Sequence, residues 1–265
     1  MAVGVLILFG LLIAAGSRYL FVTSIKGGNF KSVFALTKPL SNSQRAILRK
    51  YFKFYLYLPP KSQRIFENRL VKFIALKNFV PRNMPLVTVE MQVLIAASAI
   101  QLTFGYPNVF LSYFKNIVIF PDQFYSKEGQ AYHKGEVNPK AKAIAISWRH
   151  FAEGYASSEG VNLGLHEMAH ALQLENIVVN NEYNFLNQQA INKWQVLADL
   201  EIEKIKSGES SLLRPYGATN NSEFFAVAVE VFFERPSDFI KYNQALYQAL
   251  ANVLRQDPIR LYKRL

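Results

Sequence analysis

The sequence H-E-M-A-H at residues 166–170 constrains the fold more than any other part of the chain. In an α-helix, residues four positions apart lie on one face, so a helix here would place the imidazoles of His166 and His170 side by side. Two such imidazoles can bind one metal ion. Glu167 would lie beside the same face, where its carboxylate could take a proton from a metal-bound water. The segment is therefore expected to be a helix that carries half of a metal site.

The alternative is that the pattern arose by chance in a structural helix. The chain has 4 histidines in 265 residues, and shuffling such a composition produces the pattern in roughly 0.3% of chains. The surrounding residues are apolar on both sides, including Leu165, Met168 and Leu172, which predicts a buried helix. Two histidines and a glutamate are costly to bury unless they are hydrogen-bonded or bound to metal. A metal-dependent hydrolytic site is therefore favoured over a structural helix.

The composition restricts which residues can hold such a metal. Cysteine is absent, which excludes thiolate zinc clusters, disulfides and cysteine nucleophiles, so the ligands must be His, Asp or Glu. With 51% hydrophobic residues, the chain can bury a large core. The net charge of +11 comes from basic residues spread along the chain without a recognisable DNA- or RNA-binding motif. No nucleic-acid partner is therefore expected.

The N-terminal segment is apolar enough to span a membrane. Residues 2–22 carry one charge, Arg18, and as a helix they would measure roughly 31 Å, about one hydrocarbon core. Basic residues follow the segment, which by the positive-inside rule places the rest of the chain in the cytoplasm. A cleaved signal peptide and a buried N-terminal helix are the alternatives, but a basic start typical of signal peptides is missing. We expect a single-pass anchor over 1–23, a linker over 24–40 and a metallopeptidase domain over 41–265.

The pattern of apolar residues and chain breakers predicts an α+β domain, mainly helical with a small β-sheet. Two β-prone runs precede the metal helix, and the segment between them is expected to form a turn. Asn221 or Ser222 is expected to cap the apolar helix that follows. The expected helices cover residues 41–58, 60–74, 88–102, 163–174, 181–206, 222–236 and 237–255, the strands 116–120 and 141–147, and the turn 132–139.

A tetrahedral catalytic zinc needs three protein ligands, and the helix at 163–174 supplies two. Glu223 and Glu230 are candidates for the third because they lie seven residues apart on one face of an otherwise apolar helix. Glu223 lies in the first turn, where it can approach a facing helix, so we assign it to the metal. Glu230 is expected to accept a hydrogen bond from a ligating histidine, and the reverse assignment stays open. Glu234 is expected to be solvated or paired with Arg235.

The two glutamate-containing motifs give the chain a resemblance to a known family. H-E-x-A-H at 166–170 and E-x-F-A-V at 223–227 resemble motifs of the Mlc titration factor A (MtfA) family of zinc-dependent peptidases. The resemblance extends from about Ser41 to the C-terminus. It implies a gluzincin-like zincin fold for this region. The N-terminal anchor is a departure, because the soluble titration factor lacks one.

The resemblance also implies roles for individual residues. One Zn²⁺ would be held by His166, His170 and Glu223, with Glu167 as the general base. Tyr216 would polarise the scissile carbonyl or stabilise the oxyanion. A packed aromatic ring with a satisfied hydroxyl is the alternative for this tyrosine.

The two remaining histidines are further candidates for the predicted site, and one residue near it departs from the family pattern. His133 matches a family histidine that approaches the zinc in a resting state, and a surface turn position is its alternative. His150 is a candidate for a position behind the ligands or facing the substrate. Gln173 stands where the family's aspartate is expected. This departure puts in doubt how the residue behind the ligands adjusts their metal-binding properties, and it leaves the ligand set unchanged.

The function expected from these residues is hydrolysis of peptide bonds in a peptide or protein substrate by a membrane-anchored zinc peptidase. Trimming of amino termini, as by an aminopeptidase, and internal cleavage are both open. The alternative is a regulatory binding protein that sequesters a transcriptional repressor or another protein partner, with the zinc site secondary.

Overall fold

The computed structural model describes residues 39–126, 128–156 and 160–262.

The first helices begin at the residues that the sequence predicts, but the first of them ends earlier than expected. Helix α3 (Asn42–Tyr51) starts with a capping box at Ser41, and α5 (Pro60–Leu76) starts at a proline. The expected continuous helix over 41–58 is wrong, because the chain breaks at Phe52 before α4 (Lys53–Tyr57).

The break at Phe52 has a packing reason. Phe52, Phe54 and Tyr55 are all buried. In one straight helix Phe52 and Tyr55, three residues apart, would share a face, but Phe54 would point away from Phe52. The break lets all of them enter the core, where Phe66 of α5 contacts each ring.

The apolar helix α6 (Val89–Leu102), which Thr88 caps, lies in the chain between the first two strands of a four-stranded sheet. Its strands are β1 (Asn78–Pro81), β2 (Asn116–Phe120), β5 (Gly135–Asn138) and β6 (Ala143–Ser147), in the spatial order β1-β2-β6-β5. The first three in that order are parallel, and β5 pairs with β6 in the antiparallel direction. Alternate residues of β2 and β6 are fully buried, as expected for strands packed on helices: Ile117, Ile119, Ile144 and Ile146.

The expected turn over residues 132–139 is wrong. The segment contains β5 and most of β4 (Ala131–His133), and β4 pairs with β3 (Phe124–Ser126) to form a separate two-stranded hairpin. The four residues of β5, G-E-V-N, show no alternation of burial, since all of them are half-buried. Its strand conformation is stabilised by pairing with β6, from Gly135 opposite Ile146 to Asn138 opposite Ala143. This tertiary pairing overrides the turn-like local composition.

The second half of the chain is helical. After α7 (Trp148–Ala156) and α8 (Leu163–Ile177), α9 spans Gln188–Lys206 and begins later than the expected residue 181, because Asn187 caps it. The short helix η1 (Pro215–Thr219) leads into α10 (Asn221–Glu234). The expected helix over 237–255 is divided into α11 (Pro236–Tyr242) and α12 (Gln244–Leu254), because the Asn243 side chain caps α12. The last helix is α13 (Pro258–Tyr262).

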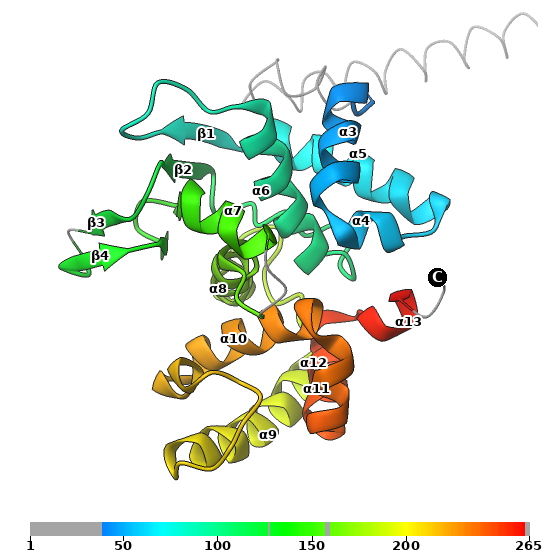
Figure 1. Ribbon diagram of the computed structural model, residues 1–265, viewed down its shortest axis with the longest axis vertical. Helices are drawn as coiled ribbons and strands as arrows, with labels where there is room; N and C mark the ends of the chain where they lie inside the picture. The colour runs from blue at the N-terminus through cyan, green and yellow to red at the C-terminus, as the bar shows by residue number, and fades with distance from the viewer. Residues whose placement is uncertain (1–38, 127, 157–159, 263–265) are drawn as a thin grey trace, which may run out of the picture. The chain divides into compact units, whose positions relative to one another are not determined.

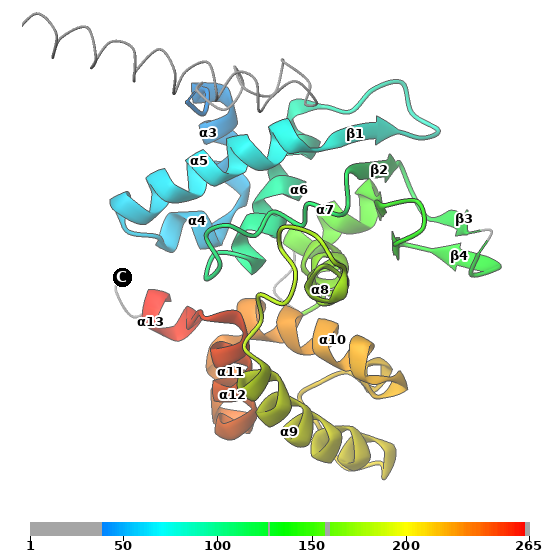
Figure 2. The same cartoon turned by 180° about the vertical axis from the view of Figure 1, so that it is seen from behind.

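Helix α8 lies at the centre of residues 39–262. It packs against α6, β5 and β6 on one side and against α10 on the other. Figures 1 and 2 show the sheet and α3–α7 on one side of α8, and α9–α12 on the opposite side. Helix α8 therefore contributes side chains to contacts with both halves.

Among the described residues, no helix has the length and apolar character needed to cross a membrane. The predicted anchor over 1–23 and the predicted linker up to Lys38 lie outside the described residues. The α+β prediction, mainly helical with a small sheet, is confirmed for the described region.

Candidate metal centre

The metal helix is positioned by the cap at its N-terminus. Asn162 is the N-cap of α8, and its side chain accepts a hydrogen bond from the backbone N–H of Leu165 at 3.0 Å. From this start, His166 and His170 lie one turn apart on the same face. Their Nε2 atoms approach to 3.1 Å. Both imidazoles therefore direct the same nitrogen toward one point.

Helix α10 brings a carboxylate to that point. Asn220 caps α10, one or two residues before the expected cap positions, and places Glu223 in the first turn. The Oε2 atom of Glu223 lies 3.1 Å from Nε2 of His166 and 3.5 Å from Nε2 of His170. Among the described residues, this group of three is the only one found with His, Asp or Glu ligand atoms all within 4.8 Å of one another.

The separations of these three atoms fit a zinc ion. Ligand atoms about 2.0–2.1 Å from a tetrahedral zinc lie roughly 3.3 Å from one another. The observed separations of 3.1, 3.1 and 3.5 Å are close to that value. The donor set of two imidazoles and one carboxylate is also one that catalytic zinc sites use.

Glu230 holds His166 from behind. Its carboxylate lies 2.8 Å from Nδ1 of His166, and the side chain is buried, with 1% exposed. The same carboxylate accepts hydrogen bonds from the guanidinium of Arg214 and from the backbone N–H of Asn162, each at 2.5 Å. A proton on Nδ1, donated to Glu230, leaves the lone pair of Nε2 directed at the candidate metal position.

The charges of the centre favour a cation between the ligand atoms. Burial lowers the pKa of His166, but Glu223 and Glu230 outweigh burial and raise this pKa to about 10. Burial raises the pKa of Glu223, but hydrogen bonds and charge interactions with His166 and His170 hold it well below its usual range. The carboxylates thus stabilise positive charge at the imidazoles, which is also the electrostatic condition for binding a metal cation.

Comparison with known proteins agrees with this geometry. A family model described as glucose-regulated metallo-peptidase M90 matches residues 30–255, most of the chain. The chain belongs to the M90 metallopeptidase family. The resemblance to Mlc titration factor A that the motifs indicated is confirmed.

Relatives of this M90 chain cover most of its length at moderate identity. Uncharacterized protein slr2042 of Synechocystis sp. is 26% identical over 238 residues, 84% of this chain and 86% of the relative. Mlc titration factor A of Yersinia pestis is 26% identical over 227 residues, which are 77% and 81% of the two chains. The factor of the same name in Edwardsiella ictaluri is 25% identical over 197 residues, 68% and 73% of the two chains.

Glu167 of this M90 chain lies beside the ligands in a buried position. Its side chain packs against β5, where Gly135 leaves the room for it: a Cβ atom at Gly135 would overlap the carboxyl group of Glu167. Burial raises the pKa of Glu167 to about 8, and the charge of His166 opposes this rise. Both Glu167 and Gly135 line a cavity of about 570 Å³ that also reaches His166.

We predict that Gly135→Ala lowers peptide hydrolysis roughly 10- to 100-fold, because the added methyl displaces the Glu167 carboxyl group, and misplacement of a reacting group by about 1 Å costs on this order. Zinc content is expected to stay at the wild-type value, since the three atoms nearest to the added methyl all belong to Glu167. Steady-state kinetics and metal analysis check the two expectations. Loss of zinc together with activity would show that Gly135 supports the ligands instead.

Tyr216 and the remaining histidines surround the same cavity. Tyr216 in η1 is half exposed, its ring centroid lies 6.2 Å from that of His166, and burial and the Glu223 carboxylate raise its pKa. His150 in α7 contacts the Ser147 hydroxyl through Nδ1 at 2.8 Å. His133 turns its Nε2 atom toward Gly129 and does not belong to the group of three ligand atoms.

Glu234 differs from the expectation of a solvated or Arg235-paired residue. Its carboxylate accepts a hydrogen bond from the Asn162 side chain at 2.9 Å, and burial raises its pKa to about 7. Arg235 pairs with Asp238 instead, at 2.9 Å. Glu230 and Glu234, one turn apart on α10, therefore both hold the cap of the metal helix.

Four residues that support the site were not predicted from the sequence. Gly135 lies in a segment expected to be a turn, and Arg214 lacks a motif that would single it out. Asn162 has a signal, because an Asn before an apolar run is a typical N-cap. Ser222 is expected only as a helix cap, and the structure places its hydroxyl 3.0 Å from Nδ1 of His170.

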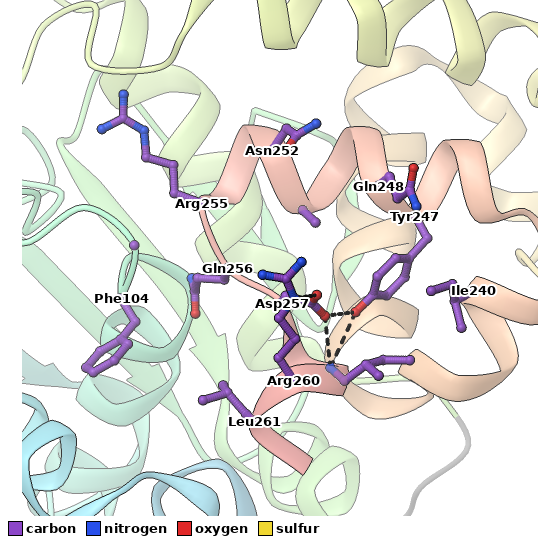
Figure 3. A pocket seen from close by; sticks show the side chains of 13 residues that line it. Phe104, Ile240, Tyr247, Gln248, Asn252, Arg255, Gln256, Asp257, Arg260 and Leu261 are labelled. Carbon is purple, nitrogen blue, oxygen red and sulfur yellow. Dashed lines mark hydrogen bonds and ion pairs between the residues drawn. The ribbon is translucent and has the colours of Figure 1, made fainter. Parts of the chain in front are cut away.

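A second, larger cavity of about 870 Å³ lies away from the metal centre, beside α12 and α13. Figure 3 shows its lining, in which the Tyr247 hydroxyl donates to Asp257 at 2.7 Å and both groups accept from the backbone N–H of Ile259. No histidine lines this cavity, and its acid is committed to holding the start of α13. The smaller cavity, which Glu167 lines, is the better candidate for the active site.

Proposed function

We propose that this M90 chain is a zinc-dependent peptidase in which His166, His170 and Glu223 hold the ion and Glu167 is the general base. The observation that carries the proposal is the convergence of three ligand atoms within 4.8 Å of one another. A buried carboxylate and a cavity adjoin this group. The M90 family assignment supports metal-dependent peptide hydrolysis in general.

The residues around the ion divide the chemistry between them. A zinc ion in such a site supplies Lewis acidity and lowers the pKa of water. Glu167 takes the proton of the attacking water and transfers it to the leaving amine. The Tyr216 hydroxyl, at the rim of the cavity, donates a hydrogen bond to the substrate carbonyl oxygen as negative charge develops there. Glu230 and Arg214 keep His166 in the orientation that this chemistry needs.

The edge of the sheet offers a binding position for the substrate backbone. Strand β5 is the last in the order β1-β2-β6-β5, so one of its edges has no partner strand within the described residues. Gly135 of β5 lines the cavity beside Glu167. An extended peptide that pairs with this edge would pass directly in front of the general base. We therefore propose extended peptide segments, rather than folded surfaces, as substrates.

Hydrolysis of a panel of chromogenic peptides tests the proposed function. We expect turnover that a chelator abolishes and that added Zn²⁺ restores. The panel includes substrates with free and with blocked amino termini, so that amino-terminal trimming and internal cleavage are distinguished. Absence of chelator-sensitive turnover, together with tight binding of a protein partner, would favour the alternative of a regulatory binding protein that sequesters a repressor or another partner.

We propose further that the apolar residues 1–23 anchor the peptidase domain to a membrane, with the domain on the cytoplasmic side. The support is the length and composition of the segment and the basic residues that follow it. The full chain is expected in the membrane fraction after alkaline washing, and a chain that starts at Ser41 in the soluble fraction. Release of the full chain by the alkaline wash would overturn the anchor and leave the metal centre unaffected.

A further inference from the structure

The Nδ1 atoms of the two candidate histidine ligands, which point away from the metal position, contact different kinds of side chain. Nδ1 of His166 faces the Glu230 carboxylate at 2.8 Å. Nδ1 of His170 faces a neutral group, the Ser222 hydroxyl, at 3.0 Å. The Ser222 hydroxyl in turn donates a hydrogen bond to Oε1 of Gln173 at 2.9 Å. Ser222 belongs to α10, whereas His170 and Gln173 lie one turn apart on α8.

The direction of each hydrogen bond follows from the groups involved. A serine hydroxyl has one proton to donate, and Oε1 of a glutamine can only accept. Because Ser222 donates to Gln173, its oxygen accepts from the Nδ1–H of His170. A neutral imidazole with its proton on Nδ1 has a free lone pair on Nε2. This is the nitrogen that lies 3.1 Å from Nε2 of His166 and 3.5 Å from the Glu223 carboxylate.

We infer that Ser222 and Gln173 are positioning residues: they form a neutral hydrogen-bond relay that orients His170 toward the metal and fixes its tautomer. The inference rests on the proposed function, in which His170 is a zinc ligand. The hydroxyl of Ser222 supports His170 without adding negative charge, whereas Glu230 places a carboxylate behind His166. The relay also connects α8 to α10, the two helices that supply the ligands.

The relay is tested by measuring zinc affinity in competition with a chromophoric chelator. Ser222→Ala and Gln173→Leu are each expected to weaken zinc binding about 10- to 100-fold, the range found when the partner behind a ligand is removed. The double variant is expected to bind no more weakly than Ser222→Ala alone, because both changes interrupt the same relay. Gln173→Glu is expected to bind zinc at least as tightly as wild type, because its carboxylate accepts the same proton and adds negative charge.

Two controls separate the relay from a general effect on the fold. Ser222→Thr keeps the hydroxyl and is expected to retain wild-type affinity. Ser237→Ala removes an exposed serine from the first turn of another helix, α11, and is expected to change nothing. All variants are expected to unfold at the wild-type temperature without zinc and to differ only in the rise of that temperature when zinc is added.

The outcomes also separate the relay from the metal centre. Wild-type zinc affinity in Ser222→Ala or Gln173→Leu, or losses that add in the double variant, would overturn the relay alone. Absence of zinc binding by the wild-type protein would overturn the metal centre and the relay with it.

Discussion

Glu167→Gln is expected to lower peptide hydrolysis by roughly 10²- to 10⁴-fold, the contribution of a positioned general base, while zinc stays bound. Glutamine has the size of glutamate and can fill the space left by Gly135, but it cannot take a proton from water. Glu167 lies outside the group of three ligand atoms, so its change leaves that group intact. In the metal-free protein, burial raises the pKa of Glu167 to about 8. A cation beside it favours the carboxylate, the form that acts as base at neutral pH.

The measurement is kcat/KM for a chelator-sensitive substrate, together with metal analysis of the same preparation. Glu203→Gln is the matched control, because it makes the same chemical change on the exposed surface of α9, where the Glu203 carboxylate pairs with Lys206. We expect wild-type activity in this control. Glu167→Gln protein that contains stoichiometric zinc and hydrolyses peptides at the wild-type rate would exclude Glu167 as the base.

The elements that carry strong local signals were predictable from the sequence. The helices that Ser41 and Thr88 cap begin where the expected ranges begin, and the alternating isoleucines of β2 and β6 form strands as expected. The failures lie where long-range contacts decide the conformation. Phe52 breaks a helix so that neighbouring aromatic residues can be buried, and β5 becomes a strand because β6 pairs with it. Local sequence does not contain either contact.

The candidate site shows the same division. The spacing of His166 and His170 is enough to place both on one helical face, because helix geometry alone decides it. The spacing of Glu223 and Glu230 places both on one face of α10. Which of them binds the metal and which accepts a hydrogen bond from His166 depends on how α10 packs against α8. The importance of Gly135 and Ser222 lies in what they touch: the Glu167 carboxyl group and the His170 ring. Neither contact can be read from residue type or spacing.

Glu223→Gln and Glu230→Gln are expected to separate the ligand from its supporting partner. Both changes replace a carboxylate by an amide of the same size on the same face of α10. Glu223→Gln removes the charged ligand atom that lies 3.1 and 3.5 Å from the two imidazole nitrogens, so zinc affinity should fall by on the order of 10³-fold or more, beyond the range of a supporting residue. Activity should be lost with the zinc.

Glu230→Gln should weaken zinc binding only about 10- to 100-fold, because Glu230 acts on the metal through Nδ1 of His166. It should also destabilise the metal-free protein by about 2 kcal/mol, since the buried carboxylate bonds Arg214 and the backbone at Asn162, and hydrogen bonds to charged groups contribute on this order. Glu223→Gln should destabilise the metal-free protein less, because the Glu223 side chain is 18% exposed and that of Glu230 is 1% exposed. Chelator competition and chemical denaturation measure the two effects. The opposite ranking of zinc affinities would make Glu230 the ligand, which requires α10 to turn about its axis relative to α8.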